Sequence, residues 1–212
     1  MTMPAELDCY MTARCKRVDK TLKTLLRARP EEPKTIAKAM GYSMFAGGKR
    51  LRPVLVMAAA ECCGLSGDKV LKTACALEMI HTYSLIHDDL PAMDDDDFRR
   101  GRPTSHRVFG EAVAILAGDA LLTEAFGLLT APDCVNRHDP KRLLTVIQVI
   151  AAAAGSRGMV GGQTLDIASE GQAVDAAHLE SVHRRKTGAL IQASLRAGAL
   201  LAEASPGQLE AI

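Results

Sequence analysis

Apolar residues recur along this chain at steps of three and four positions, which is the spacing of one face of an α-helix. The first series runs from Leu7 to Leu26 and stops before Pro30, which cannot continue a helix. Six further segments have the same character: 36–45, 54–63, 70–90, 106–127, 141–154 and 176–204, the last interrupted by Gly188. No convincing alternation of apolar and polar residues predicts a strand. The sequence therefore predicts an all-α bundle of about seven helices.

Composition excludes several classes of protein. The 212 residues are 48% hydrophobic, enough for one well-buried core, and no linker divides them, so we expect a single domain over 1–212. A net charge of +1 and 3% aromatic residues do not indicate a nucleic-acid surface. No uninterrupted apolar stretch reaches about 18 residues, and the N-terminus lacks the apolar core of a secretory signal. We expect a cytoplasmic protein without a membrane span.

The cysteines lack the paired CxxC spacing of a zinc or redox site. They are Cys9, Cys15, Cys62, Cys63, Cys75 and Cys134. We interpret all six as reduced packing residues, and we expect adjacent Cys62 and Cys63 to lie on a buried helix face.

Six aspartates fall within ten positions of the segment HDDLPAMDDDDFRRG (87–101), where the fourth predicted helix ends. Carboxylates this close repel one another unless cations join them, and Mg²⁺ is typically held by one or two carboxylates plus substrate phosphates. The following Arg99 and Arg100 carry planar forks that suit phosphate. The segment therefore indicates a site where Mg²⁺ and arginine bind the same polyphosphate. The alternative is a solvated acidic loop. The apolar helix that leads into the segment argues against this alternative, because it would carry Asp88 and Asp89 out of a packed interior.

Asp88 and Asp94 are six positions apart, with Pro91 between them. On an uninterrupted helix they would point to different faces, but a proline-broken turn can bring them together. We therefore expect this pair, with Asp89 beside it, to bind magnesium. The next three aspartates (95–97) either raise the local negative potential or point to solvent.

The segment GGKRLRP (47–53) places three cations beside two glycines at a helix entry. Backbone N–H groups and arginines there form a natural anion site, and the glycines permit close approach. Taken alone, the segment is better explained as a basic surface turn. His81 stands seven positions before Asp88, two helical turns away on nearly the same face, and is either a cavity residue or an ordinary core histidine.

Two weaker patterns occur later in the chain. Gln163 and Asp166, in GGQTLD, are three positions apart and share a helical face; alone they indicate an ordinary helix start. Lys186 and Thr187, in HRRKTG, belong to a basic cluster that is either a solvated face or a phosphate donor.

In this order the motifs resemble those of the trans-isoprenyl diphosphate synthases (polyprenyl synthetases), and most closely the bacterial-type farnesyl diphosphate synthases. The segments that carry the resemblance are GGKRLRP (47–53), HTYSLIHDDLPAMDDDDFRRGRPTSH (81–106), GEAVAILAGDALL (110–122), GMVGGQTLD (158–166) and HRRKTGALI (183–191). The resemblance implies an isoprenoid-synthase-type helical bundle around a central cavity, usually as a homodimer. It also implies a Mg²⁺-dependent prenyltransferase that condenses isopentenyl diphosphate with dimethylallyl or geranyl diphosphate to farnesyl diphosphate and pyrophosphate.

The resemblance further implies roles for individual residues. Isopentenyl diphosphate is expected to contact Gly48, Lys49, Arg52, His81 and Arg100. The allylic diphosphate is expected to contact Arg99, Gln163, Lys186 and Thr187. The expected magnesium ligands are Asp88, Asp89, Asp94 and Asp166, and the expected catalytic residues are Asp88, Asp94, Arg99 and Lys186.

The residues before the aspartates bear on product length. Tyr83 lies five positions before Asp88, with Ser84 beside it. In relatives that carry a Pro-Ala pair like the one at 91–92, an aromatic residue at this place implies a farnesyl product, and a smaller one a geranylgeranyl product. The alternative is a core tyrosine with a satisfied hydroxyl.

One feature of the family is missing. Family members carry a second DDxxD motif on a later helix, and the chain reaches Ile212 without one. Half of the expected magnesium ligands and part of the cavity wall would then be lacking. We therefore expect a C-terminally truncated synthase domain that is inactive, or nearly so, alone.

Three alternative functions stay open: a geranylgeranyl diphosphate synthase, a non-catalytic partner subunit of a synthase, and a terpene cyclase. The missing motif fits a partner subunit, but the intact first aspartate motif, Lys49, Arg52 and Arg99 do not, because a pure binder has no use for them. A cyclase needs no second diphosphate site, so Lys49, Arg52 and His81 count against it.

Overall fold

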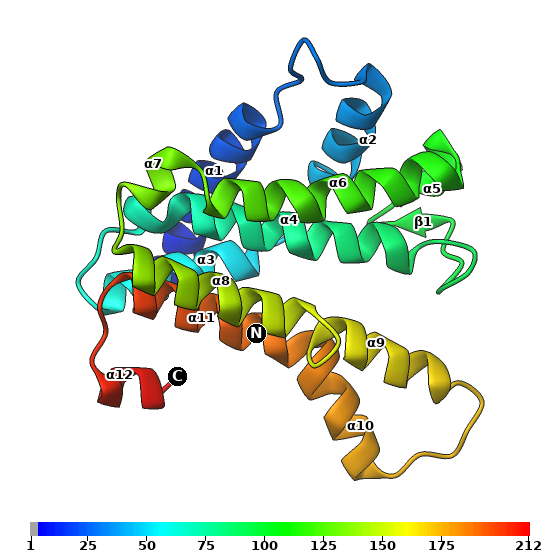
Figure 1. The fold of residues 1–212 in the computed structure, drawn as a ribbon. Coiled ribbons are helices and arrows are strands. Elements are labelled where there is room, and N and C mark those ends of the chain that lie inside the picture. The colour runs from blue at the N-terminus through cyan, green and yellow to red at the C-terminus, as the bar shows by residue number, and fades with distance from the viewer. Residues whose placement is uncertain (1–3) are drawn as a thin grey trace.

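The computed structural model describes residues 4–212, which are mainly helical (Figure 1), as the sequence predicts. The α-helices are α1 (Ala5–Leu25), α2 (Lys34–Met44), α3 (Leu51–Cys62), α4 (Leu71–Asp88), α5 (Ser105–Phe109), α6 (Glu111–Leu129), α7 (Pro132–Val135), α8 (Pro140–Ala154), α9 (Met159–Ala168), α10 (Ala176–His183), α11 (Ala189–Leu201) and α12 (Pro206–Glu210). The remaining elements are a 3₁₀ turn (Gly67–Val70), a π-helix (Arg184–Gly188), and the antiparallel strands β1 (Phe98–Arg99) and β2 (Arg102–Pro103).

Helix α4 lies at the centre of the bundle. Eleven of its 18 residues are buried, including every one from 73 to 80, so no face of this stretch is open to solvent. Helices α6 and α3 pack against it, and α11 packs against both α3 and α8 (Figure 1). Because α4 is anchored along most of its length, its last turn holds Asp88 at the edge of the packed interior.

Two predicted helices are each divided in two. The segment 106–127 is split at Gly110, whose φ of 81° lies in the left-handed region that favours glycine. The segment 176–204 is interrupted by a π-helix that ends at Gly188, where the sequence predicts an interruption; a π-helix is a local widening of the backbone often found at functional sites. The helix expected over 70–90 ends at Asp88, because the residue before Pro91 is disfavoured in the helical region.

The cysteine prediction is partly wrong. Cys75 and Cys134 are buried as expected, whereas Cys9 and Cys62 are exposed and Cys63 is half-buried. Adjacent residues of a helix lie about 100° apart around its axis, so the neighbouring pair cannot share one face. Cysteines are free throughout the described residues.

Two stretches, Glu111–Leu129 and Pro140–Ala168, have the length and hydropathy of a membrane-spanning helix. The first is α6, which packs against α4. The second combines α8 and α9, which are separated by a turn at 155–158. Core helices of a bundle have the same composition, so neither stretch indicates a membrane span by itself.

Candidate active site

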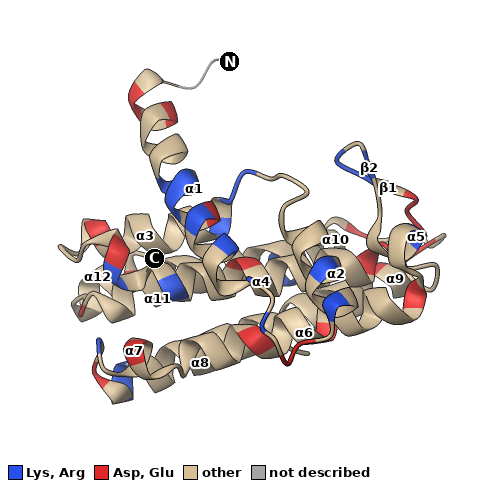
Figure 2. Cartoon of the chain, turned by 90° about the horizontal axis from the view of Figure 1, so that it is seen from above, with Lys and Arg blue, Asp and Glu red and all other residues tan. Residues whose placement is uncertain are grey.

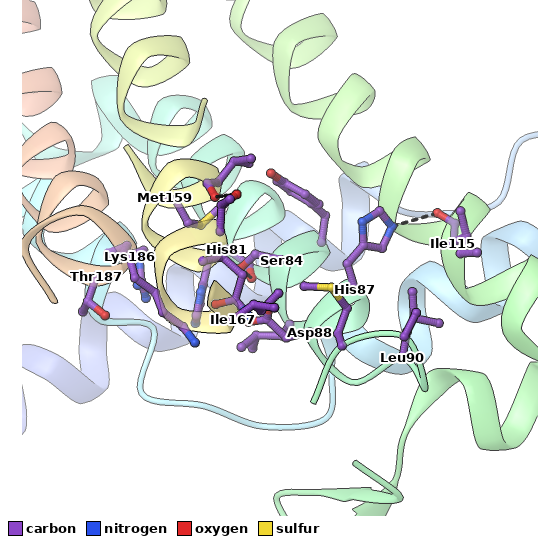
Figure 3. A pocket seen from close by; sticks show the side chains of 18 residues that line it. His81, Ser84, His87, Asp88, Leu90, Ile115, Met159, Ile167, Lys186 and Thr187 are labelled. Atoms are coloured by element: carbon purple, nitrogen blue, oxygen red, sulfur yellow. Dashed lines mark hydrogen bonds between the residues drawn. The ribbon is translucent and has the colours of Figure 1, made fainter. Parts of the chain in front are cut away.

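A cavity of 530 Å³ opens beside the C-terminal end of α4 (Figure 3). Of the residues predicted for the site, it is lined by Arg52, His81, Tyr83, Ser84, Asp88, Gln163, Lys186 and Thr187. Much of the remaining lining is apolar: Leu85, Leu90, Met93, Ile115, Met159, Val160 and Ile167. The sequence did not single out these apolar residues, because they look like ordinary core positions. A cavity with this lining suits a molecule that has a charged head and a hydrocarbon tail.

The turn after α4 brings Asp94 back toward Asp88. The backbone N–H of Asp94 donates to the carbonyl oxygen of Asp88 at 2.9 Å, and Asp95 adopts a left-handed φ of 51°. Burial raises the pKa of Asp88 to about 6, an effect opposed by Lys186 and reinforced by Asp94. A cation bound here would therefore relieve a carboxylate that is both desolvated and close to another negative charge.

Asp89 pairs with Arg99 and does not line the main cavity. Its carboxylate is only 5% exposed and is 2.6 Å from the guanidinium of Arg99, which is also 3.7 Å from Asp96. Arg99 belongs to β1 and Asp96 to the loop before it, where acidic and basic residues follow one another along the ribbon (Figure 2). The structure thus brings Arg99 to Asp89 rather than to the lining of the main cavity.

Lys186 projects from the π-helix toward α9. Its ammonium group is 2.6 Å from a carboxylate oxygen of Asp166. Burial opposes the charge of Lys186, but the hydrogen bond to Asp166 and the charges of Asp88 and Asp94 outweigh it, so the pKa of Lys186 is raised. One cation therefore faces three of the predicted magnesium ligands.

Gly162 permits this arrangement. A Cβ at position 162 would lie 2.7 Å from the Cα of Lys186 and 2.8 Å from the carbonyl carbon of Arg185. The backbones of α9 and the π-helix can approach this closely only because position 162 carries no side chain. Next to it, Gln163 is buried, and among the described residues neither polar atom of its side chain has a hydrogen-bond partner. Such an unsatisfied amide on a cavity wall is available to a polar ligand.

A second cavity, of 390 Å³, lies on the other side of His81 and Arg52, which line both cavities. Its lining contains the other residues predicted for isopentenyl diphosphate, Gly48, Lys49 and Arg100, together with Arg50, Leu51 and Glu78.

Burial lowers the pKa of His81 to about 3, with the surrounding arginines adding to the effect, and it lowers that of Arg52 as well. Within the described chain, His81 Nδ1 and Arg52 Nε are buried without partners. Because the positive charges clustered here are poorly solvated, the pocket favours the binding of an anion.

Arg50 holds the wall of the second cavity and was not singled out by the sequence. It has a left-handed φ of 48°, and its side chain, 4% exposed, binds Asp19 at 2.9 Å and Glu78 at 2.8 Å. It also donates to the carbonyl oxygen of Met44. The only hint in the sequence is Glu78, a charged residue within the apolar series of α4. The segment 47–53 is therefore not simply a basic surface turn, because one of its cations, Arg50, is buried and bound to acidic residues of other helices.

The donor set fits a magnesium ion that shares its coordination with a ligand. Within residues 4–212, no three acidic, histidine or cysteine side chains converge to form a metal site of protein donors alone. Asp88 and Asp94 would supply carboxylate oxygens, and Mg²⁺ usually completes its shell with water and phosphate oxygens. Asp166 is engaged by Lys186, and Asp89 by Arg99.

The fold and its two cavities define an all-α protein suited to ligands that have an anionic head and an apolar tail. The chain belongs to the polyprenyl synthetase family, whose sequence profile matches residues 33–212. It is 53% identical over 180 residues to farnesyl diphosphate synthase of Geobacillus stearothermophilus, covering 85% of this chain and 60% of that enzyme. It is 47% identical to farnesyl diphosphate synthase of Bacillus subtilis, covering 99% of this chain and 70% of the relative.

Solved structures agree with this assignment. An FPP/GFPP synthase from Zymomonas mobilis superposes with a TM-score of 0.92 at 38% identity, covering 98% of this chain and 75% of the other. A putative farnesyl-diphosphate synthase from Marinomonas superposes with a TM-score of 0.87 at 44% identity, covering 99% and 73%. The isoprenoid-synthase helical fold expected from the sequence is thereby confirmed.

Proposed function

We propose that this protein is a Mg²⁺-dependent prenyltransferase that joins isopentenyl diphosphate to dimethylallyl or geranyl diphosphate, releasing pyrophosphate and forming farnesyl diphosphate. The observation that carries the proposal is the pairing of two cavities across His81 and Arg52. One cavity combines an apolar lining with Asp88 and Lys186; the other gathers cations. Two anionic heads and one growing hydrocarbon chain fit this arrangement.

In the first cavity the allylic diphosphate would lie against Lys186, Thr187 and Gln163, with its hydrocarbon tail along the apolar wall. Asp88 and Asp94 would hold magnesium, which would supply positive charge beside the leaving pyrophosphate. Lys186 stabilises the negative charge that develops there as the allylic C–O bond breaks and its electron pair leaves with the pyrophosphate. Arg99 would contact the allylic diphosphate only after its ion pair with Asp89 is broken.

In the second cavity the diphosphate of isopentenyl diphosphate would be bound by Lys49, Arg52 and Arg100, beside Gly48 and His81. Its double bond then points toward the first cavity. The π electrons form the new C–C bond to the allylic cation, and a proton lost from the adjacent carbon passes to the pyrophosphate. Proximity of the two bound substrates supplies much of the rate enhancement.

The test uses the protein expressed from its complete gene, incubated with geranyl and isopentenyl diphosphates and Mg²⁺, with products identified by mass spectrometry. Asp88→Ala and Asp94→Ala are each expected to lower kcat/KM by about 100-fold or more, since a metal clamp contributes several kcal/mol. The matched control is Asp97→Ala, an exposed aspartate of the same loop that pairs with Arg107. Absence of condensation in the unmodified protein, or full activity in the two variants, overturns the proposal.

A geranylgeranyl product is the second candidate, because relatives with that activity in their names are also similar. A geranylgeranyl pyrophosphate synthase of Catharanthus roseus is 46% identical over 206 residues. The buried ring of Tyr83 in the cavity wall favours the farnesyl product, since it limits the depth available to the chain. The ratio of the two products in the same assay discriminates between them.

We also propose that two copies of the chain associate. Helix α6 exposes Ile115 and Leu116, at 42% and 56%, next to half-buried apolar residues of the same helix. A second copy of the same face would remove this apolar surface from water. Light scattering on the purified protein is expected to give the mass of a dimer; a monomer mass contradicts the proposal.

A further inference from the structure

The imidazole of His87 packs against α6 at Gly118, in a space that a side chain at position 118 would fill. A Cβ at Gly118 would lie 2.6 Å from Cδ2 of His87, and closer still to Nε2. The Nε2–H group of His87 donates to the carbonyl oxygen of Ile115 at 3.1 Å (Figure 3). The ring thus packs against one turn of α6 and is hydrogen-bonded to it.

His87 in turn supports the cavity wall. Its ring meets the ring of Tyr83 edge to face, with centroids 5.6 Å apart and planes at 83°. The two residues are four positions apart on α4, and both line the main cavity. A continuous line of contact therefore runs from Gly118 through His87 to Tyr83 and the space that the hydrocarbon tail would fill.

We infer that Gly118 and His87 help to determine which allylic substrates the cavity accepts, a step that rests on the proposed function. Gly118 is a positioning residue: it lets the imidazole lie back against α6, where the ring forms part of the cavity wall. His87 keeps Tyr83 at the depth that the tail of geranyl diphosphate requires. Neither residue takes part in breaking or forming bonds.

The direction of the effect follows from the geometry. In Gly118→Ala the new methyl group would fill the space that the imidazole now occupies, and the backbone of α6 lies behind it. The imidazole must then move away from α6. Movement toward Tyr83 or into the cavity, both of which the ring already borders, reduces the space along the wall. Geranyl diphosphate, one isoprene unit longer than dimethylallyl diphosphate, loses more than the shorter substrate does.

The experiment compares Gly118→Ala with Gly127→Ala in the protein expressed from its complete gene. Gly127 lies on the same helix, and a Cβ there meets nothing within 4 Å, so this control carries the same chemical change without the contact. We expect Gly118→Ala to lower kcat/KM for geranyl diphosphate about 10-fold more than for dimethylallyl diphosphate, a difference near 1.4 kcal/mol. Geranyl diphosphate then accumulates, whereas Gly127→Ala keeps the unmodified product profile.

A second variant keeps the inference testable if Gly118→Ala does not fold. His87→Ala removes the ring and widens the wall, so products longer than those of the unmodified protein are expected. The double variant Gly118→Ala/His87→Ala should recover the use of geranyl diphosphate. Equal losses for both substrates in Gly118→Ala, or an unchanged product profile in His87→Ala, overturn the inference. If the unmodified protein and Gly127→Ala form no product, the proposed function fails instead.

Discussion

The ammonium group of Lys186 lies 2.6 Å from a carboxylate oxygen of Asp166, so the π-helix and α9 are joined by an ion pair at the edge of the main cavity. The pair is partly exposed, with side-chain accessibilities of 28% and 46%. Lys186 is therefore held in place without being sealed off, and an incoming diphosphate can compete with Asp166 for it.

Removing this cation is expected to weaken catalysis more than folding. Lys186→Ala should raise KM for the allylic diphosphate and lower kcat/KM by about 100-fold, because one preorganised charge at the leaving group is lost. Steady-state kinetics on the protein from its complete gene measure this. Arg184→Ala is the control, since Arg184 forms an exposed pair with Glu180 on the other side of the segment. Unchanged kinetics in Lys186→Ala would contradict its assigned role.

Gly162→Ala is expected to separate α9 from the π-helix. The new Cβ would meet backbone atoms of residues 185 and 186, which cannot rotate away as a side chain can. Overpacking of this kind costs about 1–3 kcal/mol. Urea unfolding of the 212-residue chain followed by circular dichroism measures the loss. Gly41→Ala in α2, where a Cβ meets nothing within 4 Å, should leave stability equal or slightly higher.

The buried pair of Arg50 and Glu78 predicts a large asymmetry between single and double substitutions. Glu78→Ala leaves a buried guanidinium with one partner fewer and should lower the free energy of unfolding by about 3–5 kcal/mol. Arg50→Met/Glu78→Leu, which removes both charges, should cost less than Glu78→Ala alone. Glu180→Ala, which breaks an exposed pair, should cost at most about 0.5 kcal/mol. A loss in Glu78→Ala no larger than in Glu180→Ala would show that the buried pair does not stabilise the fold.

His81 predicts a specific pH dependence of stability. Burial lowers its pKa in the folded chain to about 3, whereas the unfolded chain takes up the proton near pH 6.5. Below pH 6.5 the unfolded state binds more protons than the folded state does. The free energy of unfolding therefore decreases as the pH is lowered, by roughly 1.5 kcal/mol between pH 6.5 and 5. His81→Gln should abolish this part of the slope. The measurement is urea unfolding of both proteins at several pH values; parallel pH profiles would contradict the burial of a neutral imidazole.

The local features of the chain were predictable from its sequence. The three- and four-residue spacing of apolar side chains is a property of neighbouring positions, and it located the helices that form the core. Pro91 predicted that α4 would end near the aspartates, and the following turn does return Asp94 to the backbone of Asp88. The same local reasoning missed the break at Gly110, because a helix-compatible pattern continues on both sides of it.

Other features depend on residues that only the folded chain brings together. Arg50 and Glu78 are 28 positions apart, and His87 and Ile115 are also 28 apart. Asp89 and Arg99 belong to one acidic and basic segment, yet which charge pairs with which follows from the path of the turn between them. Periodicity records how often a side chain faces the core, and it carries no information about which distant residue it meets there. Burial, partner and charge state at the site were therefore set by packing between helices.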